Sequence, residues 1–107
     1  MSTELTRALV DAMKGNVVLE FGASWCPICK GARGLIDAAL AEHPQVKHYW
    51  VEDGKGKPLG RSFRVKLWPT LVFLRDGQEV SRVVRPSRPE EVTSLLAELS
   101  DAPGSFR

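Results

Sequence analysis

The chain has 107 residues, 43% of them apolar, which is the size of one ordinary domain that can bury its own core without disulfide crosslinks. Its 15 basic and 13 acidic side chains leave a formal net charge of +2, too small to indicate a general binder of nucleic acid or of anionic membranes. No apolar stretch approaches a membrane-spanning length, and charged residues interrupt the N-terminal segment where a secretory signal would be continuously apolar.

The first half of the chain predicts a helix, a strand and a second helix. Helical spacing before a Gly-Asn stop predicts a helix over residues 3–14, with an apolar face of Leu5, Ala8, Leu9, Ala12 and Met13. The run VVLEF predicts a buried strand over residues 17–21. Helical spacing returns from Pro27, and Pro44 cannot continue it. Cys26 and Cys29 are therefore expected where a strand leads into a helix.

The second half predicts three strands and two helical segments. VKHYWV (46–51) is expected as a strand, followed by a loop with one or two helical turns. TLVFL (70–74) and EVSRVV (79–84) flank Asp76-Gly77, a strong hairpin turn. The last helix is expected to begin with a capping box of Ser87 and Glu90, with Pro89 in its first turn and an apolar face of Val92, Leu95, Leu96 and Leu99. Residues 101–107 are expected to be a flexible tail.

This order predicts a single α/β domain over residues 1–107, with a mixed sheet and helices on both faces. Taken as the complete product, the sequence predicts a cytoplasmic protein, where structural disulfides are rare. The Cys-x-x-Cys pair then indicates redox catalysis or a metal site rather than a structural crosslink.

A helix start favours a thiolate at the first cysteine, because it presents free N–H groups and the positive end of the helix dipole. Cys26 is therefore expected to be the more exposed nucleophile, with a lowered pKa, and Cys29 the resolving thiol. Pro27 suits the first turn of this helix. Lys30 and Arg33 either add positive potential or are solvated helix residues.

A zinc site is the competing interpretation of the cysteines, because Cys26, Cys29, His43 and His48 have the spacing of a two-cysteine, two-histidine finger. The predicted elements do not suit it. Pro44 ends the helix directly after His43, and His48 is expected on the surface of a strand. Zinc binding is therefore the weaker hypothesis.

The chain resembles the thioredoxin superfamily over nearly its whole length. The resemblance rests on WCPICK after VVLEFGAS, the Trp68-Pro69-Thr70 step at a strand start, the segment VEDGKGKPLGRSFRV and the hairpin LVFLRDGQEV. It implies a thioredoxin fold with a four-stranded mixed sheet, and a thiol–disulfide oxidoreductase that reduces protein disulfides. A non-catalytic thioredoxin-like adaptor remains an alternative.

The resemblance also implies roles for residues around the cysteines. Pro69 is expected to be cis, with the backbone of Trp68 beside the disulfide, where it pairs with an extended substrate peptide. Trp25 is expected to cover the disulfide and contact substrate. The full expected substrate-binding set is Trp25, Pro27, Ile28, Trp68, Pro69, Thr70 and Arg85.

Glu20 is an acid within an otherwise apolar strand, which indicates a buried group with a specific role. The resemblance places it beneath Cys29, where a carboxylate moves protons as Cys29 attacks. The alternative is a carboxylate with a purely structural role.

Four features depart from the usual thioredoxin pattern. Pro-Ile stands between the cysteines, which leaves the redox potential open. Trp50 stands where thioredoxins carry the lysine that pairs with the buried acid, so Glu20 is expected to lack a charged partner. Arg85 stands where thioredoxins have a glycine, which would narrow the groove or favour acidic partners. Trp68 replaces the usual aliphatic residue.

The expected reaction needs no metal, nucleotide or flavin, because the redox group is the Cys26–Cys29 pair itself. The expected partners are disulfide-containing protein substrates and a dithiol electron donor such as a reductase. Neither nucleic acid nor a membrane is expected as a partner, and the protein is expected to be a monomer.

Overall fold

The computed structural model describes residues 4–100 of the chain. Its elements follow in the order α1 (Arg7–Asp11), β1 (Asn16–Gly22), α2 (Pro27–Ala41), β2 (Lys47–Glu52), α3 (Pro58–Ser62), β3 (Thr70–Arg75), β4 (Gln78–Val84) and α4 (Pro89–Ser100). The expected tail and the first residue of the expected N-terminal helix lie outside the described residues. Within residues 4–100, none of the helices combines the length and apolar character that a membrane crossing requires.

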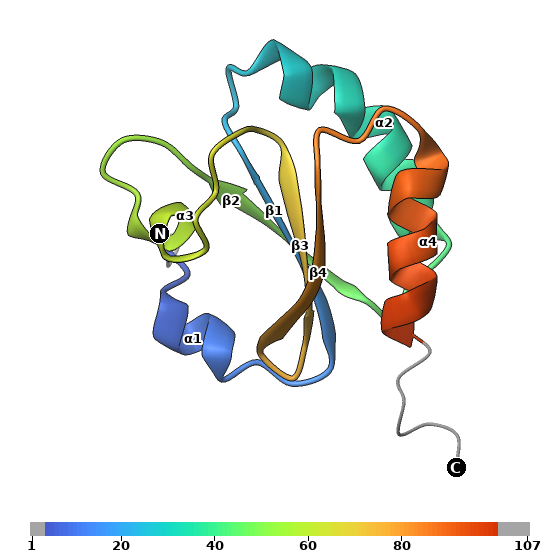
Figure 1. The fold of residues 1–107 in the computed structure, drawn as a ribbon, viewed down its shortest axis with the longest axis horizontal. Helices are drawn as coiled ribbons and strands as arrows, with labels where there is room; N and C mark the ends of the chain where they lie inside the picture. Colours follow the sequence, from blue (N-terminus) through green and yellow to red (C-terminus); the bar gives the residue numbers. More distant parts are fainter. Residues whose placement is uncertain (1–3, 101–107) are drawn as a thin grey trace.

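The strands form one mixed sheet in the order β2-β1-β3-β4. β1 runs parallel to β2 and antiparallel to β3, and β3 and β4 form the hairpin. The parallel pair is connected through α2, as parallel strands require a crossover. Figure 1 shows the sheet between two pairs of helices, with α2 and α4 on one side and α1 and α3 on the other.

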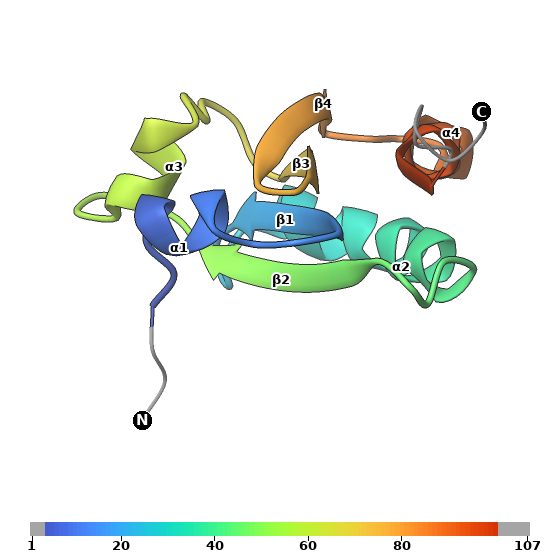
Figure 2. The ribbon, with the colours of Figure 1, turned by 90° about the horizontal axis from the view of Figure 1, so that it is seen from below.

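Alternation along β1 and β3 supplies a core to each face of the sheet. One core contains Val18, Leu71 and Phe73 with buried side chains of α2 and α4, among them Ile36 and Leu96. The opposite core contains Val17, Leu19, Phe21, Val72 and Leu74, together with buried side chains of α1 and α3. Helices cover both faces of the sheet, which Figure 2 shows from below, so β1 and β3 are apolar along most of their length.

The predicted mixed four-stranded sheet with helices on both faces is confirmed. The N-terminal helix is shorter than predicted, because the Thr6 hydroxyl accepts a hydrogen bond from the Leu9 N–H (3.1 Å) and fixes the first turn. A helix of five residues turns Val10 into the core and leaves Ala8, Leu9 (48%) and Ala12 exposed, so the predicted apolar face was wrong at these three residues.

The predicted capping box was wrong in its acid. The Glu91 carboxylate, rather than that of Glu90, accepts the Ser87 N–H at 2.7 Å. The helix begins at Pro89, as expected, so Glu91 lies one residue further along the first turn, where its side chain reaches back to the chain before the helix.

The β3–β4 turn forms at Asp76-Gly77, as predicted. Both residues have positive φ angles, 51° and 83°, the backbone form that suits a two-residue hairpin. The turn also packs against α1, since a Cβ added at Gly77 would lie 2.2 Å from the carbonyl oxygen of Asp11. Gly77 is therefore required by both its backbone conformation and this close approach.

Replacing Gly77 with Ala should lower the free energy of unfolding by about 1–3 kcal/mol, because alanine would be strained at this φ and would push the turn away from α1. Gly34→Ala in α2 is the matched control: a Cβ there meets no atom within 4 Å, so the change should stabilise the protein by about 0.5–1 kcal/mol. Urea unfolding measures both. Equal effects of the two substitutions would contradict the packing of the turn.

Candidate active site

The two cysteines lie at the start of α2, directly after the loop that follows β1. Cys26 is the N-cap residue, and its Sγ accepts a hydrogen bond from the Cys29 N–H at 3.2 Å. Pro27 occupies the first turn, where a missing N–H costs no helical hydrogen bond. Both cysteines are free thiols and both are largely buried, with Cys26 5% and Cys29 2% exposed. The expected difference in exposure is therefore small, and the two thiols differ mainly in their electrostatic surroundings.

The surroundings of Cys26 favour its thiolate. Burial acts to raise the pKa of the Cys26 thiol, but hydrogen bonds from the Cys29 thiol and from the N–H groups of Cys29 and Ile28 outweigh it. The positive charge of Arg85 adds to the effect, and the pKa of Cys26 lies below its ordinary value. This is the direction expected for a thiol at a helix N-terminus.

Cys29 has the opposite character. Burial, the hydrogen bond that it donates to Cys26, and the nearby negative charges of Cys26 and Glu20 raise the pKa of the Cys29 thiol to about 11. At neutral pH one sulfur is thus prepared as a nucleophile, and the other holds its proton.

Gly22 lets Cys29 lie directly on the sheet. A Cβ at Gly22 would lie 2.8 Å from the Cys29 Sγ and 2.8 Å from the Trp50 ring, so any larger residue would push the sulfur or the indole away. The last residue of β1 and the first turn of α2 therefore meet without an intervening side chain.

Glu20 is fully buried on the same face of β1, two residues before Gly22. Its Oε1 lies 2.7 Å from Nε2 of His48, and its Oε2 lies 4.0 Å from the Arg33 guanidinium. The expectation that Glu20 lacks a charged partner was therefore wrong. His48 lies on the exposed surface of β2, as expected, and its side chain, 27% exposed, contacts this acid, which the sequence did not predict.

The strand register explains these contacts. Glu20 pairs with Trp50 and Val18 with His48, so His48 and Trp50 project from β2 toward the α2 face, as Glu20 does from β1. Arg33 lies one turn after Cys29 on α2, and its guanidinium stacks on the Trp50 ring at 4.8 Å. Trp50 thus replaces the expected lysine in position, while His48 and Arg33 supply the polar partners of the acid.

Glu52 is a further residue of the site that the sequence analysis missed. Its carboxylate accepts hydrogen bonds from the Ser24 N–H (3.0 Å) and from the Trp50 indole (3.1 Å). These contacts, with the Ser24 N–H foremost, lower the pKa of Glu52. An ionised Glu52 therefore fixes the loop that carries Trp25 and Cys26. Its position two residues after Trp50 on β2, which places both side chains on the same face of the sheet, was the sequence signal that could have identified it.

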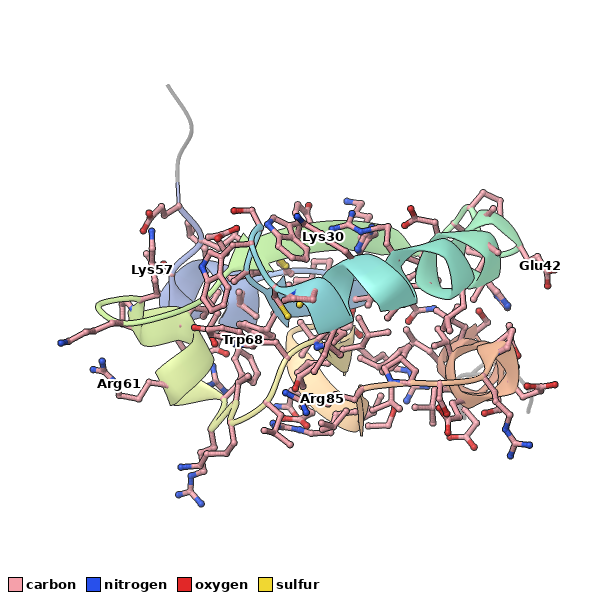
Figure 3. The ribbon with its side chains drawn as sticks, turned by 90° about the horizontal axis from the view of Figure 1, so that it is seen from above. Lys30, Glu42, Lys57, Arg61, Trp68 and Arg85 are labelled. Carbon is pink, nitrogen blue, oxygen red and sulfur yellow. The ribbon has the colours of Figure 1, made fainter. Side chains whose placement is uncertain are left out.

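Aromatic and apolar side chains surround the cysteines. Trp68 packs with Cys26 and Cys29, and its ring meets that of Trp25 edge to face at 5.5 Å. The Trp68 indole donates to the Asp53 carboxylate at 2.8 Å. The exposed apolar side chains here are Trp25 (68%), Leu67 (47%) and Ile28 (45%). Leu67 was not singled out in the sequence, and Figure 3 places Trp68 and Arg85 beside the first turn of α2.

The Trp68–Pro69 peptide bond is cis, as the resemblance implies. The Trp68 carbonyl accepts a hydrogen bond from Nε of Arg85 at 2.8 Å, so this carbonyl has an internal partner that the sequence did not reveal. Thr70 is 1% exposed and its hydroxyl donates to the Leu67 carbonyl at 2.6 Å. Thr70 therefore holds the loop before β3, and its side chain is not presented at the surface.

Within residues 4–100, no group of three or more His, Cys, Asp and Glu side chains is arranged to hold a metal ion. The residues of the zinc hypothesis also have different partners. The cysteines contact each other, and His48 contacts Glu20.

Comparisons with known proteins agree on one family. The family model described as Thioredoxin matches residues 2–98. The structure of thioredoxin 2 from Pseudomonas aeruginosa PAO1 in its reduced form is 46% identical, with a TM-score of 0.84 and 94% coverage of both chains. Thioredoxin H-type 1 of Nicotiana tabacum is 34% identical over 83% of this chain and 71% of its own length. Thioredoxin of Chlamydia pneumoniae is 30% identical over 77% of this chain and 80% of its own length.

Alkylation of the reduced protein by iodoacetamide should label Cys26 first. The alkylation rate is proportional to the fraction of each thiol that is ionised. Cys26 stays ionised to lower pH than an ordinary thiol because its pKa is lowered, whereas a pKa of about 11 keeps Cys29 protonated at neutral pH. Peptide mapping across a pH series identifies the labelled residue. The urea-unfolded protein, in which both thiols are ordinary, is the control; identical labelling of the two cysteines in the folded protein would contradict the assigned asymmetry.

Proposed function

Because the chain belongs to the thioredoxin family and is a thiol–disulfide oxidoreductase, we propose that Cys26 attacks a disulfide of a protein substrate and that Cys29 resolves the product. The observation that carries this assignment is the opposite shift of the two thiols, with the pKa of Cys26 lowered and that of Cys29 raised to about 11. A non-catalytic adaptor has no use for such a difference, since binding alone places no demand on thiol protonation.

The proposed cycle has two exchange steps. The Cys26 thiolate attacks one sulfur of the substrate disulfide, that S–S bond breaks, a mixed disulfide forms, and the departing thiolate takes up a proton. Cys29 then loses its proton and attacks the Cys26 sulfur, which releases the second substrate thiol and leaves a Cys26–Cys29 disulfide. The substrate has gained two electrons and two protons, and a dithiol donor restores the cysteine pair.

Glu20 is the proposed acceptor of the Cys29 proton. A thiol with a pKa of about 11 needs a base to attack at neutral pH, and the buried Glu20 carboxylate contributes to that raised pKa through its charge. Its Oε2 makes no hydrogen bond to the described part of the chain, while Oε1 contacts His48. Because His48 is 27% exposed, it offers a proton path from the buried acid toward solvent.

The proposed substrate groove runs between α2 and the Trp68–Pro69 loop. Trp25, Pro27 and Ile28 are exposed at its α2 side. An extended peptide that pairs with the Trp68 carbonyl would displace the Arg85 side chain, because Nε of Arg85 donates to that oxygen. Arg85 has a positive φ of 51°, and its backbone N–H donates to the Pro69 carbonyl at 2.8 Å. These contacts support a role for Arg85 in controlling access to the groove.

The remaining parts of the proposal concern the whole protein. We propose that residues 1–107 form a single domain and that the protein is a monomer. We also propose that it is cytoplasmic and that a reductase is its electron donor. The redox group is the cysteine pair, so the cycle as written needs no further cofactor.

Cys26→Ser should abolish the reduction of insulin disulfides by dithiothreitol that the protein catalyses, whereas Cys29→Ser should accumulate mixed disulfides, because the first step remains and the second is lost. Turbidity follows insulin reduction and mass spectrometry detects the adducts. Full activity of the Cys26→Ser variant would overturn the assignment, and a parent protein without activity would favour the adaptor.

Glu20→Gln should slow the resolving step at neutral pH by about a hundredfold, since a neutral amide cannot accept the Cys29 proton. Single-turnover quenching separates the formation of the mixed disulfide from its decay, and the decay is the step expected to slow. Asp37→Asn, on an exposed position of α2, is the control. A decay rate equal to that of the parent would assign Glu20 a structural role.

A further inference from the structure

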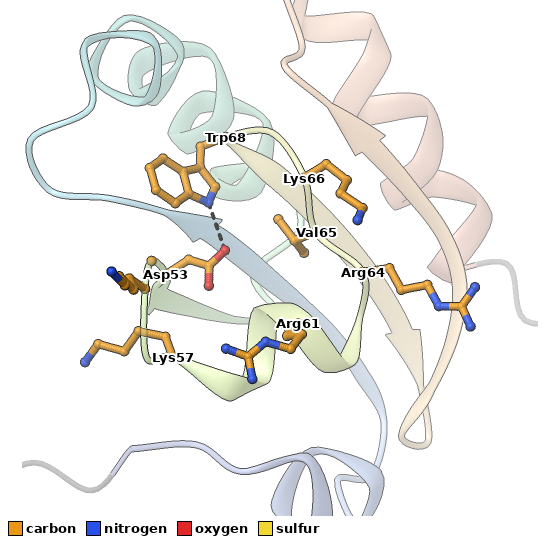
Figure 4. A pocket seen from close by; sticks show the side chains of 9 residues that line it. Asp53, Lys57, Arg61, Arg64, Val65, Lys66 and Trp68 are labelled. Carbon is orange, nitrogen blue, oxygen red and sulfur yellow. Dashed lines mark hydrogen bonds between the residues drawn. The ribbon is translucent and has the colours of Figure 1, made fainter.

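A basic cavity adjoins the candidate active site and is not used by the exchange chemistry. It has a volume of about 740 Å³ and lies between the loop after β2, the helix α3 and the loop before β3, as Figure 4 shows. The residues that line it are Asp53, Gly54, Lys55, Lys57, Arg61, Arg64, Val65, Lys66 and Trp68.

Five of the nine lining residues are cations and one is an acid. The segment from 53 to 68 therefore carries a formal charge of +4, and the rest of a chain whose total is +2 carries −2. Lys57 is paired with Glu4 at 2.9 Å, but Lys55, Arg61, Arg64 and Lys66 make no ion pair within residues 4–100. Asp53, the single acid, accepts the Trp68 indole N–H. The cavity thus concentrates unpaired positive charge.

Trp68 separates this cavity from the cysteines. One part of its indole contacts Asp53 in the cavity wall, and the ring packs with Cys26, Cys29 and Trp25. A chain bound in the active-site groove would therefore need to pass only one side chain to enter the cavity. Leu67, which precedes Trp68 in the chain, is a further exposed apolar residue (47%).

We propose that this cavity binds an acidic segment of the protein whose disulfide is reduced, a few residues from its cystine. The inference rests on the proposed function and adds a substrate class to it. An extended peptide suits the site better than a single phosphate, because the cations are spread along a chain segment around an open volume of about 740 Å³, with only Trp68 between that volume and the cysteines. The net negative charge of the rest of the chain would disfavour the docking of such a segment elsewhere.

The test compares two disulfide peptides that differ only in a flank of four glutamates or four glutamines. At low salt the acidic peptide should show a kcat/KM about five- to tenfold higher, and this ratio should fall toward one in 0.5 M sodium chloride, since screening weakens exposed charge pairs. Arg61→Gln with Lys66→Gln should lower the ratio. Lys14→Gln with Lys47→Gln removes the same charge at the opposite end of β1 and should leave the ratio unchanged.

A second experiment keeps this inference separate from the proposed function: fluorescence anisotropy measures the binding of labelled acidic and neutral peptides, both without a disulfide, to the same variants. If the protein reduced neither disulfide peptide, the proposed function would be refuted, and the anisotropy measurement alone would decide whether the docking site exists. Equal binding of the acidic and neutral peptides, or an Arg61→Gln/Lys66→Gln variant that binds like the parent, would overturn the docking site. Displacement of the acidic peptide by millimolar inorganic phosphate, but not by sodium chloride of equal ionic strength, would overturn it in favour of a small-phosphate site.

Discussion

The close packing of Cys29 on Gly22 is the constraint on which the site depends. With no side chain at Gly22, the first turn of α2 rests on the end of β1, and both the Cys29 sulfur and the Trp50 ring occupy the space where a Cβ would lie. That contact buries Cys29 and places Cys26 at the N-cap, where it receives the Cys29 N–H. The difference between the two thiols follows from this one junction of strand and helix.

Charges on both sides of the junction between β1 and α2 increase the difference between the pKa values of Cys26 and Cys29. On the sheet side, Glu20 helps to keep Cys29 protonated, and its own burial is compensated by His48 and Arg33. On the groove side, Arg85 favours the Cys26 thiolate while its Nε holds the Trp68 carbonyl. The protein thus places negative charge beneath one sulfur and positive charge near the other, within a site that is closed to bulk solvent on the Cys29 side.

Local patterns in the sequence predicted the order of the helices and strands. VVLEF before a helical repeat predicted the junction that holds the cysteines, and Asp76-Gly77 predicted the hairpin, because these signals depend on neighbouring residues alone. The partner of Glu20 required the register between β1 and β2, which brings His48 to the same face from 28 positions away. Likewise, the cations of the 53–68 segment have no periodicity, and only the fold gathers them around one cavity.

The equilibrium potential of the Cys26–Cys29 couple tests the central claim, that this pair acts as a reductant of protein disulfides, most directly. It can be followed through tryptophan fluorescence in dithiothreitol redox buffers, because Trp50 and Trp68 pack against the cysteines and Trp25 contacts Trp68. Because the chain belongs to the thioredoxin family, the account predicts a potential near about −270 mV, that of thioredoxin. A potential of about −180 mV or higher would contradict the account and identify an isomerase-like or oxidising protein.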